Sequence, residues 1–148
     1  MERVFEVDAP PEQVWDLVSD LRRLVPLTDP RTAIAMDGGD KPIRTGTKYH
    51  LTTKSGLKSD WTVLRLIPPK EIAHRIDLGV WDGGISTVRL ERTDAGTRVT
   101  LLTPTVPWPQ TWAPVRWGTW PLVLREAKQV GERFERAVRA YLAESPAS

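Results

Sequence analysis

The end of the chain, residues 120–144, has the pattern of one long amphipathic α-helix. Its apolar side chains recur at spacings of three and four, which places them on a single stripe of a helix. Charged residues fill the other side, and pairs such as Glu132 with Arg136 have the stabilising i,i+4 spacing. About 24 residues make a rod roughly 36 Å long, so the rest of the chain must supply a surface that buries the stripe. The stripe consists of Val123, Ala127, Val130, Phe134, Ala137, Val138 and Tyr141.

The middle of the chain has the turn sequences that separate the strands of β-hairpins. Short segments with alternating apolar and polar residues are separated by Ser-Gly, Pro-Pro, Asp-Gly-Gly and Asp-Ala-Gly sequences, which are turn signals. Consecutive segments joined in this way predict an antiparallel meander. With one strand near the N-terminus and a short one near residue 34, the count is about seven. The predicted strands are 3–8, 32–36, 46–54, 57–67, 71–79, 85–92 and 98–103.

Two short helices are expected between the first two strands. Val14, Leu17, Val18 and Leu21 have helical spacing after a pair of prolines, which suit a helix start. We predict a helix over 11–20 and one further turn over 21–27.

Composition excludes several classes of function. Lys plus Arg, 21 residues, exceeds Asp plus Glu, 19 residues, by only two, and the charges are interspersed, so no nucleic-acid interface is expected. Cysteine is absent, which fits a reducing compartment. We find no signal peptide or membrane span and expect a cytoplasmic protein with one domain over 1–148. His50 and His74, the only histidines, lack the spacing of a metal motif.

Four segments resemble the START-like (SRPBCC) superfamily, which includes the polyketide cyclase/dehydrase proteins and the birch-pollen-allergen fold. They are APPEQVWDLVSD at 9–20, RTGTKY at 44–49, WTVLRLIPPKEIAHRI at 61–76 and DAGTRVTL at 94–101. The resemblance implies an α+β helix-grip fold, in which a curved antiparallel sheet of about seven strands wraps the long C-terminal helix. It also implies an internal apolar cavity.

The helix stripe itself gives a compatible reason for a cavity. Ala127, Gly131 and Ala137 are too small to fill the inside of a curled sheet, so a space of a few hundred cubic ångströms is expected. The alternative is that large sheet residues fill that space.

A Trp- and Pro-rich segment, residues 104–121, precedes the helix. Its prolines recur too often for a regular helix or a central strand. Its tryptophans either plug the seam between sheet and helix or line the cavity mouth, where Trp112 and Trp117 would stack on a ligand.

Polar residues on inward strand faces are candidates for chemistry. His74 shares its strand face with apolar residues and would be a general base or an orienting group, or else a hydrogen-bonded core residue. Tyr49 could present its hydroxyl to a ligand, and either Asp60 or Trp61 points inward. Glu126, Val130 and Phe134 are the helix candidates for ligand contact, with Glu126 on the edge of the stripe.

The resemblance leaves an enzyme and a binding protein as alternatives. A cyclase, aromatase or dehydratase would fold a polyketide-like chain by cavity shape and would need no cofactor and no metal. A carrier, sequestering or resistance protein would use the same cavity for binding alone. A co-chaperone-like interaction module is the third possibility. The expected partner is a hydrophobic small molecule, and the expected state is a monomer or homodimer.

Overall fold

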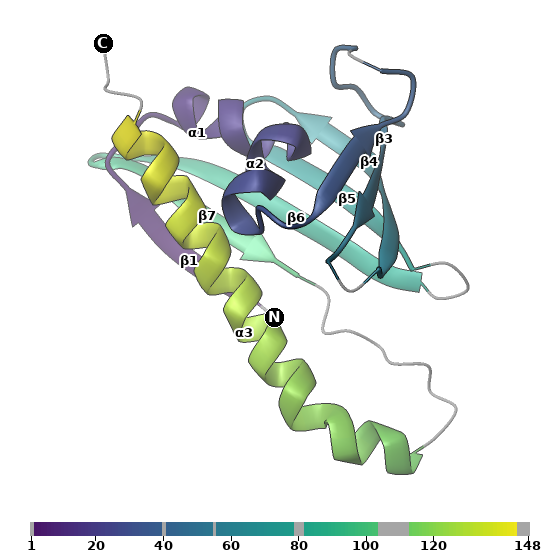
Figure 1. The fold of residues 1–148 in the computed structure, drawn as a ribbon. Helices are drawn as coiled ribbons and strands as arrows, with labels where there is room; N and C mark the ends of the chain where they lie inside the picture. The colour runs from purple at the N-terminus through teal and green to yellow at the C-terminus, as the bar shows by residue number, and fades with distance from the viewer. Residues whose placement is uncertain (1, 40, 55, 79–81, 104–112, 145–148) are drawn as a thin grey trace.

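The protein has an α+β fold in which a curved antiparallel sheet holds a long C-terminal helix against its concave face (Figure 1). The computed structural model describes residues 2–39, 41–54, 56–78, 82–103 and 113–144, and for residues 82–83 and 113–128 only the backbone. The helix-grip architecture implied by the family resemblance is confirmed.

The sheet has seven strands in the order β1-β7-β6-β5-β4-β3-β2. From β2 to β7 each strand pairs with the next one in the sequence, and β1 closes the far edge on β7. A register shift between Val63 and Arg65 marks a β-bulge, which bends and twists a strand. The strands are β1 (Glu2–Val7), β2 (Ala33–Met36), β3 (Lys48–Thr52), β4 (Lys58–Ile67), β5 (Glu71–Asp77), β6 (Asp82–Thr93) and β7 (Gly96–Leu102).

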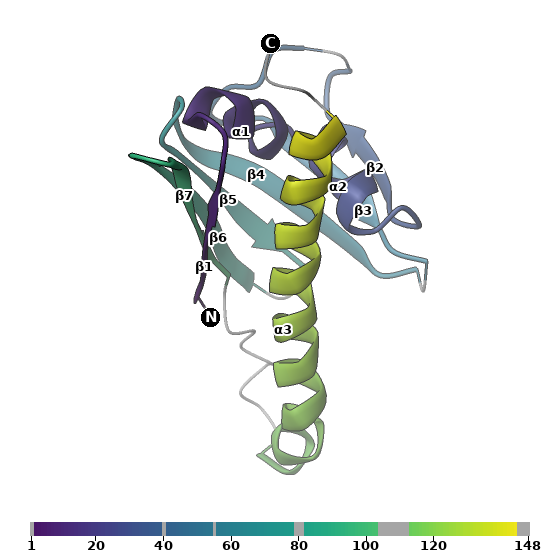
Figure 2. The same ribbon diagram turned by 90° about the vertical axis from the view of Figure 1, so that its left-hand side faces the viewer.

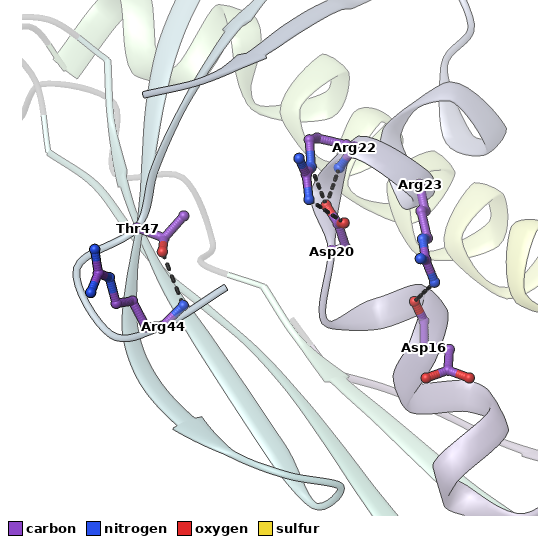
Figure 3. A network of polar contacts seen from close by, with 6 residues as sticks. All are labelled: Asp16, Asp20, Arg22, Arg23, Arg44 and Thr47. Atoms are coloured by element: carbon purple, nitrogen blue, oxygen red, sulfur yellow. Dashed lines mark hydrogen bonds and ion pairs between the residues drawn. The ribbon is translucent and has the colours of Figure 1, made fainter. Parts of the chain in front are cut away.

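Helices α1 (Pro11–Val18) and α2 (Leu21–Thr28) follow β1. The carboxylate of Asp20 caps α2, because it accepts hydrogen bonds from the backbone N–H and the guanidinium of Arg22 (Figure 3). The predicted single turn is therefore too short: α2 has eight residues and contains Pro26. One interior proline removes a single hydrogen bond, and the cap and the buried Leu24 and Val25 compensate.

Helix α3 runs from Ala113 to Glu144, so the expectation that residues 104–121 exclude a regular helix is wrong for residues 113–121. Pro114 lies in the first turn, where its missing N–H has no helical partner. Pro121 lies in the interior, where it weakens and bends a helix without ending it. The N-terminal part of α3 is bent (Figure 1).

The C-terminal half of α3 is fastened to strand β1. Phe134 meets Phe5 edge to face, with ring centroids 5.9 Å apart. Glu135 accepts from the guanidiniums of Arg3 and Arg139 at 3.0 and 3.1 Å. Arg139 also lies over the Phe5 ring, 5.6 Å from its centroid. These contacts hold the helix along one side of the concave face (Figure 2).

Candidate ligand-binding site

A cavity of about 300 Å³ lies between the concave face of the sheet, α2 and α3. Its wall is predominantly apolar, because inward positions of the strands and the buried faces of both helices carry aliphatic and aromatic side chains. Nine of the nineteen lining residues are polar or charged, and they lie on or beside the sheet strands, at and after the end of α2, and on α3. The lining residues are Val18, Leu21, Leu24, Val25, Thr28, Asp29, Thr32, Leu51, Thr53, Ser59, Trp61, His74, Ser86, Val88, Leu101, Thr103, Val130, Arg133 and Phe134.

His74 lies in this lining and is buried. The rings of Trp61 and Tyr49 meet it edge-on, with centroids 5.9 and 6.3 Å away. Its Nε2 atom is buried and has no hydrogen-bond partner among the described residues. Burial disfavours the imidazolium and lowers the pKa of His74 to about 4. The ring is therefore neutral at pH 7, and it can accept a proton or a hydrogen bond.

Tyr49 is fully buried beneath the cavity wall and is not one of the residues that line the space, contrary to the expectation that it faces a ligand. Its hydroxyl lies in the packed region toward Asp20 and Leu21, without a hydrogen bond of normal geometry to any described residue. Burial, together with the negative charge of Asp20, raises the pKa of Tyr49 to about 12. Tyr49 contributes an edge contact to His74 and no group at the surface of the cavity.

The structure decides which of Asp60 and Trp61 points inward. Trp61 lines the cavity, and its indole N–H donates to the Ser59 hydroxyl at 3.2 Å. Asp60 projects from the opposite face, where its carboxylate lies 2.7 Å from Nδ1 of the exposed His50. The bulge that follows in β4 explains why alternation alone left this strand ambiguous. As a candidate catalytic residue of the cavity, Asp60 is therefore on the wrong side of the sheet.

Helix α3 borders the cavity with Val130, Arg133 and Phe134. Phe134 is buried, whereas Val130 is 47% exposed even though it lines the space. The buried Gly131 and Ala137 are absent from this lining, so the expectation that small helix residues leave the cavity open is wrong for these two. Among the remaining candidates, Trp112 lies outside the described residues. For Trp117 and Glu126 only the helical backbone is described.

Sequence reasoning missed most of the polar residues in the cavity lining, including Ser86 and Arg133. Ser86 lies directly opposite His74 in the β5–β6 register, and Arg133 is the only basic residue in the described lining. Ser86 falls inside the predicted strand 85–92, but the predicted bounds do not give the register that places it opposite His74. Arg133 could not be found either, because it falls on the charged side of the helix pattern.

Near the end of α2, Asp29 and Arg133 bring one negative and one positive charge to the cavity lining. The Asp29 carboxylate accepts from the Arg31 N–H and the Thr32 hydroxyl. These hydrogen bonds, with Arg133 as a weaker contribution, hold the pKa of Asp29 below its usual value. This charged region contrasts with the neutral floor around His74.

Within the described ranges, His, Asp and Glu side chains form no group of three or more that could hold a metal ion. The helices there include none with the length and hydrophobicity needed to cross a membrane.

Comparison with solved structures supports the fold. A Staphylococcus aureus protein of unknown function shares 12% sequence identity at a TM-score of 0.65, over 95% of this chain and 93% of that one. A Bacillus halodurans protein shares 22% identity at a TM-score of 0.63, over 93% and 94%. A dimeric protein from Colwellia psychrerythraea shares 18% identity at a TM-score of 0.52, over 86% and 92%.

Comparison with curated protein sequences found no significant match. The family model described as polyketide cyclase/dehydrase and lipid transport matches residues 1–143. That match covers nearly the whole chain, including every strand and helix that forms the cavity. The chain therefore belongs to the polyketide cyclase/dehydrase and lipid transport family.

Proposed function

We propose that the protein binds a hydrophobic, aromatic or polyketide-like small molecule in the cavity between α2, α3 and the sheet. The observation that carries this proposal is the apolar wall of a space of about 300 Å³, at the lower end of the range for ligand pockets. That volume equals the share of about ten water molecules in liquid. Filling the space with an apolar molecule would remove hydrocarbon surface from water, which is the main source of affinity in such a site.

A second candidate function, a cofactor-independent cyclase or dehydratase, is favoured by His74. Its imidazole is neutral at pH 7 and buried in the cavity wall, so it could take a proton from carbon next to a carbonyl group during enolisation. The cavity would hold the substrate chain in a folded conformation, which lowers the barrier before any base acts. Binding without chemistry, as a carrier or sequestering protein, needs the same cavity and no base.

The binding proposal is tested with N-phenyl-1-naphthylamine, an uncharged dye whose fluorescence rises in apolar surroundings. We expect saturable binding to the wild type and at least tenfold weaker binding to Val88→Phe, which places a larger side chain in the cavity wall. The matched control is Val4→Phe on the exposed face of β1. Equal binding by all three proteins would place the dye outside the cavity and would refute the proposal.

The choice between enzyme and carrier requires the natural ligand. Native mass spectrometry of the purified protein would give the mass of a co-purified molecule, from which candidate substrates can be chosen. For an enzyme, His74→Phe should abolish turnover of such a substrate while the dye still binds. A ligand that leaves the wild-type protein unchanged after long incubation would favour the carrier.

A further inference from the structure

The floor of the cavity contains two neighbouring polar side chains on adjacent strands. His74 on β5 and Ser86 on β6 are direct partners in the antiparallel register, so their side chains leave the same face of the sheet, with Cβ atoms about 5 Å apart. Both residues are buried and both line the cavity. The next inward pair along the same strands is Ile72 with Val88, so the polar floor is local.

One nitrogen of the His74 ring has no hydrogen-bond partner in the part of the chain that the structure describes. No described residue forms a hydrogen bond with Nε2 of His74, which is buried, and the Ser86 side chain is a second polar group of the cavity lining on the adjacent strand. A buried polar group without a partner destabilises the folded protein, and such groups in native proteins call for an explanation. A ligand that hydrogen-bonds to the imidazole would remove this cost, and the adjacent Ser86 hydroxyl can give the same ligand a second hydrogen bond.

We infer that His74 and Ser86 together bind one hydroxyl group of the ligand, either a phenol or an enol. This inference rests on the proposed binding function. The ligand O–H donates to an imidazole nitrogen, and its oxygen accepts from the Ser86 hydroxyl. A hydroxyl group can do both at once, whereas a ketone oxygen only accepts.

The charge distribution of the cavity favours an uncharged group at this position. Arg133, the only basic side chain in the described lining, belongs to α3 and not to the floor. A carboxylate beside His74 would lose its hydration without gaining a cation, because burial keeps the imidazole neutral at pH 7. A neutral hydroxyl avoids this cost.

The His74 ring can meet a ligand in either of two orientations. Rotation by 180° about the Cβ–Cγ bond exchanges nitrogen and carbon positions and leaves the outline of the ring almost unchanged. Nε2 is buried, and no hydrogen bond from the described residues holds it there. A ligand hydroxyl can therefore select the ring orientation that presents a nitrogen to the cavity.

The test compares 2-naphthol with 2-methylnaphthalene, which has a methyl group in place of the hydroxyl. Both are measured by displacement of N-phenyl-1-naphthylamine from the wild type, Ser86→Ala and Thr87→Val. Thr87 is the matched control, because it is the next residue of β6 and its side chain leaves the other face of the sheet. Circular dichroism and urea unfolding establish that each variant is folded.

We expect the wild type to prefer 2-naphthol about tenfold, which corresponds to about 1.4 kcal/mol. Ser86→Ala should weaken 2-naphthol binding about fivefold and leave 2-methylnaphthalene unchanged, whereas Thr87→Val should keep the wild-type preference. Equal affinity of the wild type for both compounds, or an equal loss of both in Ser86→Ala, would overturn this inference while leaving the binding function intact. Failure of the dye to bind, or of both compounds to displace it, would refute the binding function itself.

Discussion

The buried imidazole of His74 should make the stability of the protein depend on pH in a predictable window. Its pKa is about 4 in the folded protein, against 6.5 for an unperturbed histidine. At pH 7 the ring is mostly neutral in both the folded and the unfolded chain, so it contributes little pH dependence there. As the pH falls below 6.5, the unfolded chain gains a proton that the folded protein does not, and the free energy of unfolding decreases.

The size of this effect follows from the two pKa values. Each pKa unit corresponds to about 1.4 kcal/mol, so the full difference is worth about 3 kcal/mol and is reached near pH 4. Between pH 7 and pH 5 the expected loss from His74 alone is about 2 kcal/mol. Below pH 4 both states are protonated, and the contribution no longer changes.

Urea unfolding at pH 7, 6 and 5 measures this contribution if the wild type is compared with His74→Phe. The variant keeps approximate volume and removes the titrating group, so the difference in unfolding free energy between the two proteins should change by about 2 kcal/mol over this range. Carboxylates such as Asp29 contribute equally to both proteins and cancel. His50→Phe, which removes the exposed imidazole and keeps His74, should retain the effect. A difference that stays constant within about 0.5 kcal/mol would refute the assignment of His74 as a buried, neutral and unpaired ring.

Three further substitutions test the packing around the site. Phe134→Ala should lower the free energy of unfolding by about 3 kcal/mol, because it empties the contact with Phe5; a loss below about 1 kcal/mol in urea unfolding would mean that α3 does not anchor here. Gly96→Ala should prevent stable folding, measured by thermal unfolding, because at φ +153° a Cβ atom would overlap the carbonyl oxygen of Val7; a melting temperature within a few degrees of wild type would contradict the close approach. Tyr49→Phe should be neutral or stabilising by about 1 kcal/mol, since it removes a buried hydroxyl that has no hydrogen-bond partner among the described residues; destabilisation by more than about 1 kcal/mol in urea would show that the hydroxyl is bonded.

Much of the sheet was predictable because its turns have distinctive sequences. Gly56 has φ +89° and Gly96 has φ +153°, values that glycine reaches most easily. Both glycines lie in predicted hairpin turns. The inward position of His74 was predictable for a similar reason, because β5 has no extra residue between Ile72 and Ile76 and pairs with β6 in unbroken register there.

The predictions that failed at the site concern side chains whose direction or burial is not determined by the alternation within their own strand. The β4 bulge after Val63 breaks alternation, so the sequence could not decide between Asp60 and Trp61. Tyr49 does lie on the inward face, but tertiary packing covers it, and a strand pattern carries no information about what lies above the sheet. Ser86 was overlooked because its significance depends on the residue opposite it and not on its own neighbours in sequence.

The position of the cavity follows from how α3 crosses the sheet. The helix contacts α1, α2 and strand β1, and its buried Gly131 and Ala137 are not part of the cavity lining. The cavity lies instead beside Val130 and Phe134, larger side chains that border the space between α3, α2 and the central strands. The space arises because the helix runs along one side of a curved surface. A ligand in the proposed site would contact the sheet floor at His74 and Ser86, which both line the cavity, and the polar pair on the floor would then determine what the cavity binds.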